Sequence, residues 1–194
     1  EMEMPLNNIK HHGAIYVMAS KDEEIARAIA DAVAPFNVGI FGMAHTVHEK
    51  VYKHERGLNF IAEFYADLDY DETGKLVLAK GKNSLYDSDI AAERTLKAIR
   101  EIKVTTTSGT DIDVGCDIIC VHSDTPNAVE IITKLRKLNK KFITVLNKAD
   151  KKFQSAAKED LKKNGINVTV GVCEHQAKDL NKRFFCFHEK KRPY

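Results

Sequence analysis

The sequence predicts an α/β protein in which parallel strands alternate with helices. Short apolar runs rich in β-branched residues are followed by stretches with helical spacing, and this alternation recurs along the chain. The stretch "DIICVHSDTPNAVEII", from Asp117, shows one such strand-to-helix corner. An apolar run is followed by a short polar segment and then by a stretch with helical spacing that begins at Pro126. A chain of 194 residues, 43% of them hydrophobic, can bury a sizeable core.

The first clear helix is predicted over residues 20–34. Ser20 and Glu23 form the S-x-x-E pattern that is typical of a capping box at a helix N-terminus. The helix should bury the face that carries Ile25, Ile29 and Val33.

A strand, a polar helix and a second strand are expected next. The stretch "HTVHEKVYKHERG" indicates a polar helix closed by Gly57, on which His45, His48 and His54 are expected to be solvated rather than to bind a metal. Strands are predicted on either side of it, over residues 37–41 and 58–66, with a turn at 71–74.

The second half continues the alternation. A helix over 89–102 is predicted to bury Ile90, Leu96 and Ile99, and a hairpin is predicted over 103–114 around Ser108 and Gly109. After the apolar run that ends at His122, helices and strands are expected in turn, over residues 126–138, 141–146, 152–163, 166–170 and from Glu174 onward.

Composition narrows the classes of function. The formal net charge of +2 is too small to favour nucleic acid or a membrane surface as a partner. The four cysteines lack a CxxC pair, so we expect reduced thiols in a cytoplasmic protein. The N-terminal stretch lacks the pattern of a signal peptide, and no apolar run is long enough to cross a bilayer.

Three corners between strands and helices concentrate titratable side chains. Such corners meet at one edge of a parallel sheet and suit general acid–base chemistry. They carry Lys10, His11, His12 and Tyr16, then Glu63, Asp67, Asp69 and Tyr70, and finally His122, Ser123, Asp124 and Thr125. A second interpretation of the last corner stays open, because Asp124 or Thr125 could simply cap a helix with Pro126 at its first position.

Three motifs, in order and with matching spacing, resemble the LamB/YcsF family over residues 8–138. They are "IKHHGAIYVMASKDEEIARAIADAV", "GLNFIAEFYADLDYDETGKLV" and "ICVHSDTPNAV". The resemblance implies a partial irregular β/α barrel like those of glycoside hydrolases and polysaccharide deacetylases. Because those enzymes act on carbohydrates, a role in carbohydrate metabolism is also expected. It also implies the hydrolase component of ATP-dependent cleavage of the cyclic amide 5-oxoproline to glutamate, with ATP as cofactor and other 5-oxoprolinase subunits as partners.

The resemblance also assigns roles to residues of this chain. It implies a catalytic set of Lys10, His12, Glu63, Asp67, His122 and Asp124, and a substrate-binding set of Gly13, Tyr16, Tyr70 and Thr125. It leaves any metal unknown. The chain departs from the family pattern at His11, Leu68 and Ser123, and Leu68 removes a fixed cation beside two carboxylates.

Motifs of the family's N-terminal half have no counterpart here. We therefore expect an incomplete site with weak activity by itself, and open strand edges that favour a homo-oligomer.

The C-terminal stretch carries a second resemblance. Residues 157–194 are similar to the end of the deaminase domain in the bifunctional riboflavin-biosynthesis deaminase/reductase, without its zinc signature. This implies two domains, a barrel-like part over 1–138 and an added α/β tail over 139–194. Two alternatives to the hydrolase stay open: a non-catalytic chimeric or interaction module, and a fragment of the riboflavin-pathway enzyme.

Overall fold

A computed structural model describes residues 6–77, 87–122, 125–138 and 144–147. All of them belong to the first of two compact units, Glu1–Ala157 and Lys158–Tyr194. The elements predicted over 152–163, over 166–170 and from Glu174 lie outside the described residues, as does the predicted boundary after residue 138.

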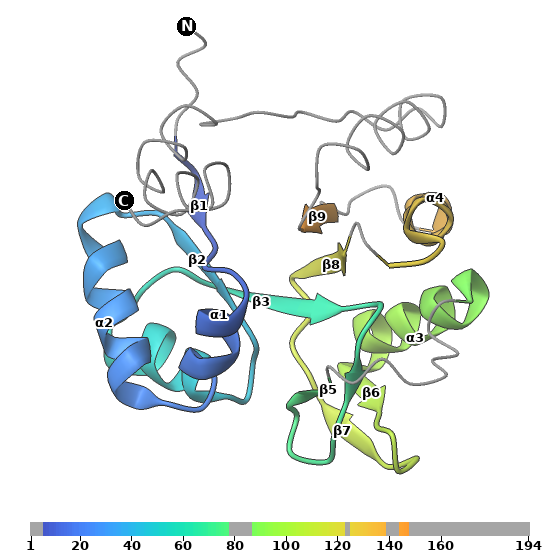
Figure 1. The fold of residues 1–194 in the computed structure, drawn as a ribbon, viewed down its shortest axis with the longest axis horizontal. Coiled ribbons are helices and arrows are strands. Elements are labelled where there is room, and N and C mark those ends of the chain that lie inside the picture. Colours follow the sequence, from blue (N-terminus) through green and yellow to red (C-terminus); the bar gives the residue numbers. More distant parts are fainter. Residues whose placement is uncertain (1–5, 78–86, 123–124, 139–143, 148–194) are drawn as a thin grey trace, which may run out of the picture. The chain divides into compact units, whose positions relative to one another are not determined.

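The first unit is built on a five-stranded sheet in which every pairing is parallel (Figure 1). The strands are β1 (Asn8–Ile9), β2 (Gly39–Gly42), β3 (Phe60–Tyr65), β8 (Ile118–His122) and β9 (Thr144–Asn147), and they lie side by side in this order. Each strand is thus added beside the previous one, as in the wall of a β/α barrel. The predicted α/β class and parallel sheet are confirmed.

Helix α2 (Glu23–Val33) forms the first core with β2. The predicted face is confirmed, because Val33 is buried and Ile25 and Ile29 pack against the buried cluster. The predicted capping box is wrong. The N-cap is Asp22, whose carboxylate accepts from the amides of Glu24 at 2.9 Å and Ile25 at 3.1 Å, while Ser20 ends the preceding helix α1 (Ala14–Ala19).

The stretch predicted as a polar helix forms a π-helix, η2 (Glu49–Glu55), that faces the core on one side. Val51 and Tyr52 are fully buried there. The expectation that His48 is solvated is wrong, since its side chain is fully buried and its Nδ1 accepts from the Met43 amide at 3.2 Å. Gly42 makes room for it, because a Cβ at Gly42 would lie 2.8 Å from the His48 Cβ.

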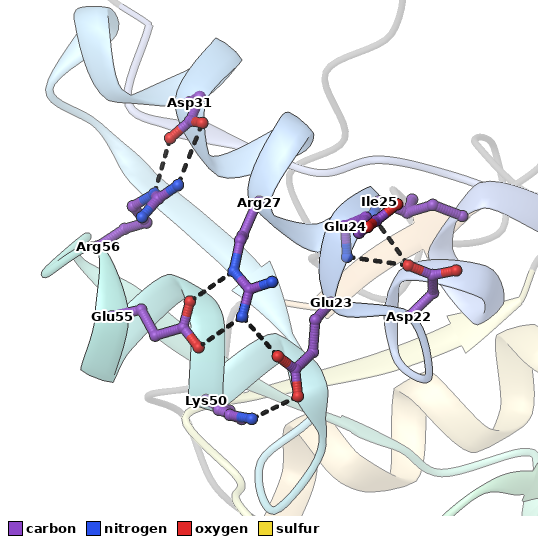
Figure 2. A network of polar contacts seen from close by, with 9 residues as sticks. All are labelled: Asp22, Glu23, Glu24, Ile25, Arg27, Asp31, Lys50, Glu55 and Arg56. Carbon is purple, nitrogen blue, oxygen red and sulfur yellow. Dashed lines mark hydrogen bonds and ion pairs between the residues drawn. The ribbon is translucent and has the colours of Figure 1, made fainter.

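Surface ion pairs join α2 to η2 (Figure 2). The Arg27 guanidinium bridges Glu23 and Glu55, Lys50 pairs with Glu23, and Arg56 pairs with Asp31 on α2. Exposed pairs of this kind contribute little individually, so burial of the α2 face remains the main attachment.

Helix α3 (Ser88–Glu101) packs beside α4 (Ala128–Leu138) through a face of small side chains. Its buried residues include Ala91, Thr95 and Ala98. The prediction that Ile90 points inward is wrong, because 41% of Ile90 is exposed. Helical spacing is compatible with burial of the face that carries Ile90 and with burial of the face of small residues. The small residues allow the two helices to pack closely, so their face is the buried one.

Two short antiparallel hairpins complete the described unit. The hairpin of β6 (Lys103–Thr105) and β7 (Asp111–Asp113) confirms the prediction around Gly109, whose φ of 87° suits a residue without Cβ. The strands β4 (Asp69–Tyr70) and β5 (Leu76–Val77) flank the predicted turn at 71–74, although they were not foreseen as strands, because each is only two residues long. None of the described helices is long and apolar enough to span a bilayer.

Candidate functional site

The three predicted corners converge at one edge of the sheet, because the strands that precede them are parallel. Lys10 follows β1, Asp67 follows β3, and His122 is the last residue of β8. A cavity of about 480 Å³ opens at this edge. Of the predicted site residues, it is lined by Lys10, His12, Gly13, Tyr16 and His122.

A buried ion pair forms one side of this site. The Lys10 ammonium pairs with Glu63 Oε1, and the two side chains are only 7% and 0% exposed. The other carboxylate oxygen, Oε2, accepts from the hydroxyls of Tyr16 at 3.1 Å and Tyr65 at 3.0 Å. Lys10 Nζ also lies 3.5 Å from the sulfur of Cys120. Both oxygens of Glu63 are therefore engaged, and its partners Lys10, Tyr16 and Tyr65 reach the cavity wall.

The two tyrosines remain hydrogen-bond donors at neutral pH. Burial raises the pKa of Tyr16 far above its ordinary value, and the negative charge of Glu63 raises it further. Burial likewise raises the pKa of Tyr65, with a further contribution from Tyr16. Both hydroxyls thus keep the proton that they donate to Glu63.

A buried carboxylate holds an imidazole on the other side of the site. Asp67 Oδ2 accepts from the His122 amide at 2.7 Å and lies 3.1 Å from His122 Nδ1. The Thr125 hydroxyl donates to the same oxygen at 2.5 Å. Because an ionised carboxylate only accepts, the proton of neutral His122 belongs on Nδ1, which leaves Nε2 as a base.

This geometry decides part of the question about the last corner. Helix α4 begins only at Ala128, after Asn127 with a φ of 61°, so the interpretation with Thr125 as the cap and Pro126 as the first helical residue is wrong. The Thr125 hydroxyl donates to Asp67. Asp124 lies outside the described residues.

Tyr70 lies beneath the site rather than in its wall. Its hydroxyl accepts from the Tyr65 amide at 3.0 Å, and its ring stacks on Phe64 with centroids 5.7 Å apart. Burial raises the pKa of Tyr70 above its ordinary value. Its predicted contact with substrate stays a prediction.

A pair of imidazoles, one of which lines the cavity, was missed as a unit by sequence reasoning. His11 Nε2 lies 3.4 Å from His48 Nε2 and 3.2 Å from the Tyr52 hydroxyl. Burial lowers the pKa of His11 to about 4, with smaller contributions from His12 and Lys10, and lowers the pKa of His48 to about 3, with a smaller contribution from His11. Both rings are neutral at pH 7. The two residues are 37 positions apart in the chain, and no local sequence pattern predicts their contact.

The remaining wall of the cavity is apolar. Met18 of α1, Leu68 after β3 and Leu76 of β5 line it, and 52% of Met18 is exposed. Leu68 therefore places an aliphatic side chain in the cavity at the position where the family pattern led us to expect a cation.

A second hollow of about 630 Å³ lies elsewhere, lined by residues such as Lys21, His45, Lys50, His54 and Lys75. It is larger, but it contains none of the predicted site residues and no buried carboxylate–imidazole pair among the residues that line it. We therefore assign the site to the smaller cavity. Within the described ranges, no group of three or more His, Cys, Asp or Glu side chains could hold a metal ion.

Comparison with known proteins gives concordant matches. The model of the LamB/YcsF family matches residues 1–154. The 5-oxoprolinase A subunit of Campylobacter jejuni is 38% identical over 141 residues, which cover 71% of this chain and 55% of that protein. The 5-oxoprolinase A subunit of Oceanobacillus iheyensis is 39% identical over 133 residues, covering 67% of this chain and 51% of that protein.

A solved structure agrees with these matches. The crystal structure of the lactam utilization protein from Thermus thermophilus has a TM-score of 0.61 and 30% sequence identity, and the match covers 85% of this chain and 57% of that one. The chain spans about half the length of the curated relatives it matches. The comparisons support neither the riboflavin-pathway origin expected for residues 157–194 nor a role in carbohydrate metabolism.

Proposed function

Because this chain belongs to the LamB/YcsF family, we propose that it is the hydrolase component of ATP-dependent cleavage of a cyclic amide, 5-oxoproline, to glutamate. The observation that carries the proposal is the Asp67–His122 pair, whose imidazole lines a cavity of about 480 Å³. A partial irregular β/α barrel is the matching fold, supported by five parallel strands that follow one another in chain order.

In this proposal His122 and His12 transfer protons. Asp67 holds Nδ1 of His122, so Nε2 can remove a proton from water as the water attacks the amide carbonyl, and the proton then passes to the leaving nitrogen. His12 lines the same cavity and is the second proton carrier. Lys10 steadies the negative charge that develops on the carbonyl oxygen.

The buried carboxylates have a supporting role. Glu63 fixes Lys10, Tyr16 and Tyr65, and Asp67 fixes His122 and Thr125. Gly13 precedes α1 with a φ of 65° and brings the backbone to the cavity wall. We keep the substrate-facing roles of Tyr16 and Thr125 and the catalytic role of Asp124 as parts of this proposal, whereas Tyr70, which lies beneath the site, supports it through its bond to the Tyr65 amide.

We assign the use of ATP to a complex with other subunits. Two relatives are each named as the A subunit of 5-oxoprolinase. Among the described residues that line the cavity, the one Lys or Arg side chain is Lys10, and its ammonium is paired with Glu63. Triphosphate binding needs several cations or free backbone amides, so these residues do not fit ATP. The proposal also includes that the chain forms a homo-oligomer and that it is located in the cytoplasm.

The test is glutamate release from 5-oxoproline with ATP, measured for the chain with and without partner subunits. We expect turnover with the partners and little without them, because an amide must be activated before it is cleaved readily. His122→Ala should remove turnover and leave the melting temperature nearly unchanged. Robust turnover by the chain alone, or full activity of His122→Ala, contradicts the proposal. A lower melting temperature with unchanged turnover in that variant would favour a purely structural corner.

A further inference from the structure

Arg94 is a buried cation that the chemistry proposed above does not use. From α3, its Nη1 donates to the carbonyl oxygens of Tyr65 at 3.1 Å and Ala66 at 3.2 Å. Its Cζ lies 5.4 Å from the ring centroid of Phe64 and 5.3 Å from that of Tyr70. Its Nε and Nη2 are buried without a hydrogen-bond partner among the described residues.

The burial of this guanidinium is unfavourable and calls for a compensating interaction. Burial lowers the pKa of Arg94, whereas the nearby Tyr70, Asp69 and Asp67 favour its charged form. The attraction is mutual, so the guanidinium of Arg94 also attracts the nearby carboxylates of Asp67 and Asp69.

The contacts of Arg94 also fix the backbone from which Asp67 projects. The Ala66 carbonyl belongs to the peptide group that continues into Asp67, and the Ala66 amide donates to the Cys120 carbonyl at 3.1 Å. The end of β3 is thus held by α3 and by β8 at the same point. The Asp67 carboxylate then meets the amide and Nδ1 of His122.

We propose that Arg94 is a positioning residue, which holds the end of β3 so that Asp67 stays in place against His122, and neutral His122 carries its proton on Nδ1 and presents Nε2 to the cavity. The inference rests on the proposed function, because that proposal assigns proton transfer to the Asp67–His122 pair. Arg94 acts through Asp67 and touches no substrate.

The test measures the tautomer of His122 by long-range ¹H–¹⁵N NMR of the imidazoles at a pH where the ring is neutral. Arg94→Met removes the charge and the donors, Arg94→Lys keeps the charge, and Arg100→Met removes a charge from the same helix away from the site. We expect the Nδ1–H form in the native chain, in Arg94→Lys and in Arg100→Met. Arg94→Met should show a mixture of tautomers.

In the glutamate-release assay with partner subunits, Arg94→Met should lower kcat at least about tenfold, with KM nearly unchanged. A His122 spectrum in folded Arg94→Met that equals the native one overturns the inference. If Arg94→Met does not fold, Arg94→Lys decides, because a mixed tautomer in that folded variant also overturns it. The NMR result does not depend on substrate, so the two proposals can fail separately. An unchanged tautomer in Arg94→Met contradicts the inference alone, and a lack of glutamate release by the native chain with its partners contradicts the proposed function alone.

Discussion

Glu63 shows how a single buried carboxylate organises several groups of the site. It receives the Lys10 ammonium on one oxygen and two tyrosine hydroxyls on the other. A buried ion is tolerated only when its partners satisfy it, and here the partners come from the end of β1, from α1 and from β3. Glu63 therefore joins segments that are far apart in the chain.

Glu63→Gln should leave the Lys10 charge buried without its counter-charge. Breaking a buried ion pair from one side costs about 3–5 kcal/mol, and we expect a loss of that order in the free energy of unfolding, measured by urea denaturation. The double variant Lys10→Met, Glu63→Gln should recover most of it, because no charge then remains buried. Equal stability of the native chain and the single variant would show that the pair carries no such role.

Leu68 should decide how well the cavity accepts an anionic group. Leu68→Arg places a cation in the apolar wall, and a charge-assisted hydrogen bond is worth about 1.5–3 kcal/mol. The affinity for 5-oxoproline, measured by calorimetry, should therefore rise about tenfold or more, whereas Leu68→Met should leave it nearly unchanged. An unchanged affinity in Leu68→Arg would place the carboxylate of the ligand away from this wall.

Residue-level reasoning from sequence predicted several of the residues that line the cavity, but not their contacts. Lys10, Asp67 and His122 could be expected to meet, because parallel strands end at a common edge. The role of Tyr65 was not foreseen, since its place in a strand gives no sign that its hydroxyl reaches Glu63. Such contacts depend on the packing of distant segments.

At the scale of elements, errors arose where two patterns competed. Ser20 and Asp22 are both good N-cap residues, and the preceding helix α1 extends to Ala19, which leaves Asp22 as the cap. The stretch of η2 is rich in charge, but Val51 and Tyr52 on it are buried, as is His48 just before it. The many polar residues of η2 concealed the narrow apolar stripe that packs against α2.

The imidazole pair that joins η2 to the cavity should make the fold sensitive to acid. The folded pKa values of His11, about 4, and His48, about 3, lie below the ordinary 6.5. Below pH 6.5 the unfolded chain therefore binds more protons than the folded chain. The contribution of these two histidines to the free energy of unfolding is fully present above pH 6.5 and is lost as the pH falls toward 4.

Urea denaturation from pH 7 to pH 4 measures this loss. Each such histidine contributes a slope of at most about 1.4 kcal/mol per pH unit. His48→Gln should reduce the slope, and His45→Gln, at a position that is not buried, should not. The same slope in His48→Gln and the native chain would contradict a neutral buried pair.

At the scale of the whole described unit, the order of strands carries most of the functional argument. Alternation of strands and helices predicted a parallel sheet, and the sheet places β1, β3 and β8 so that their carboxyl ends share one edge. The adjacency of β3 and β8 could not be derived from alternation alone, because Asp67 and His122, which meet at their ends, are 55 positions apart in the chain. Their pairing depends on long-range packing.

The most direct test of the central claim is an NMR titration of the ¹³C-labelled histidines with 5-oxoproline. The Asp67–His122 cavity is the proposed binding site, so the His122 signal should shift in a saturable way, and Asp67→Asn should weaken the effect. His45 and His54, which line the other hollow, serve as internal controls and should not move. A saturable shift confined to His45 and His54, or no shift at His122, would contradict the account.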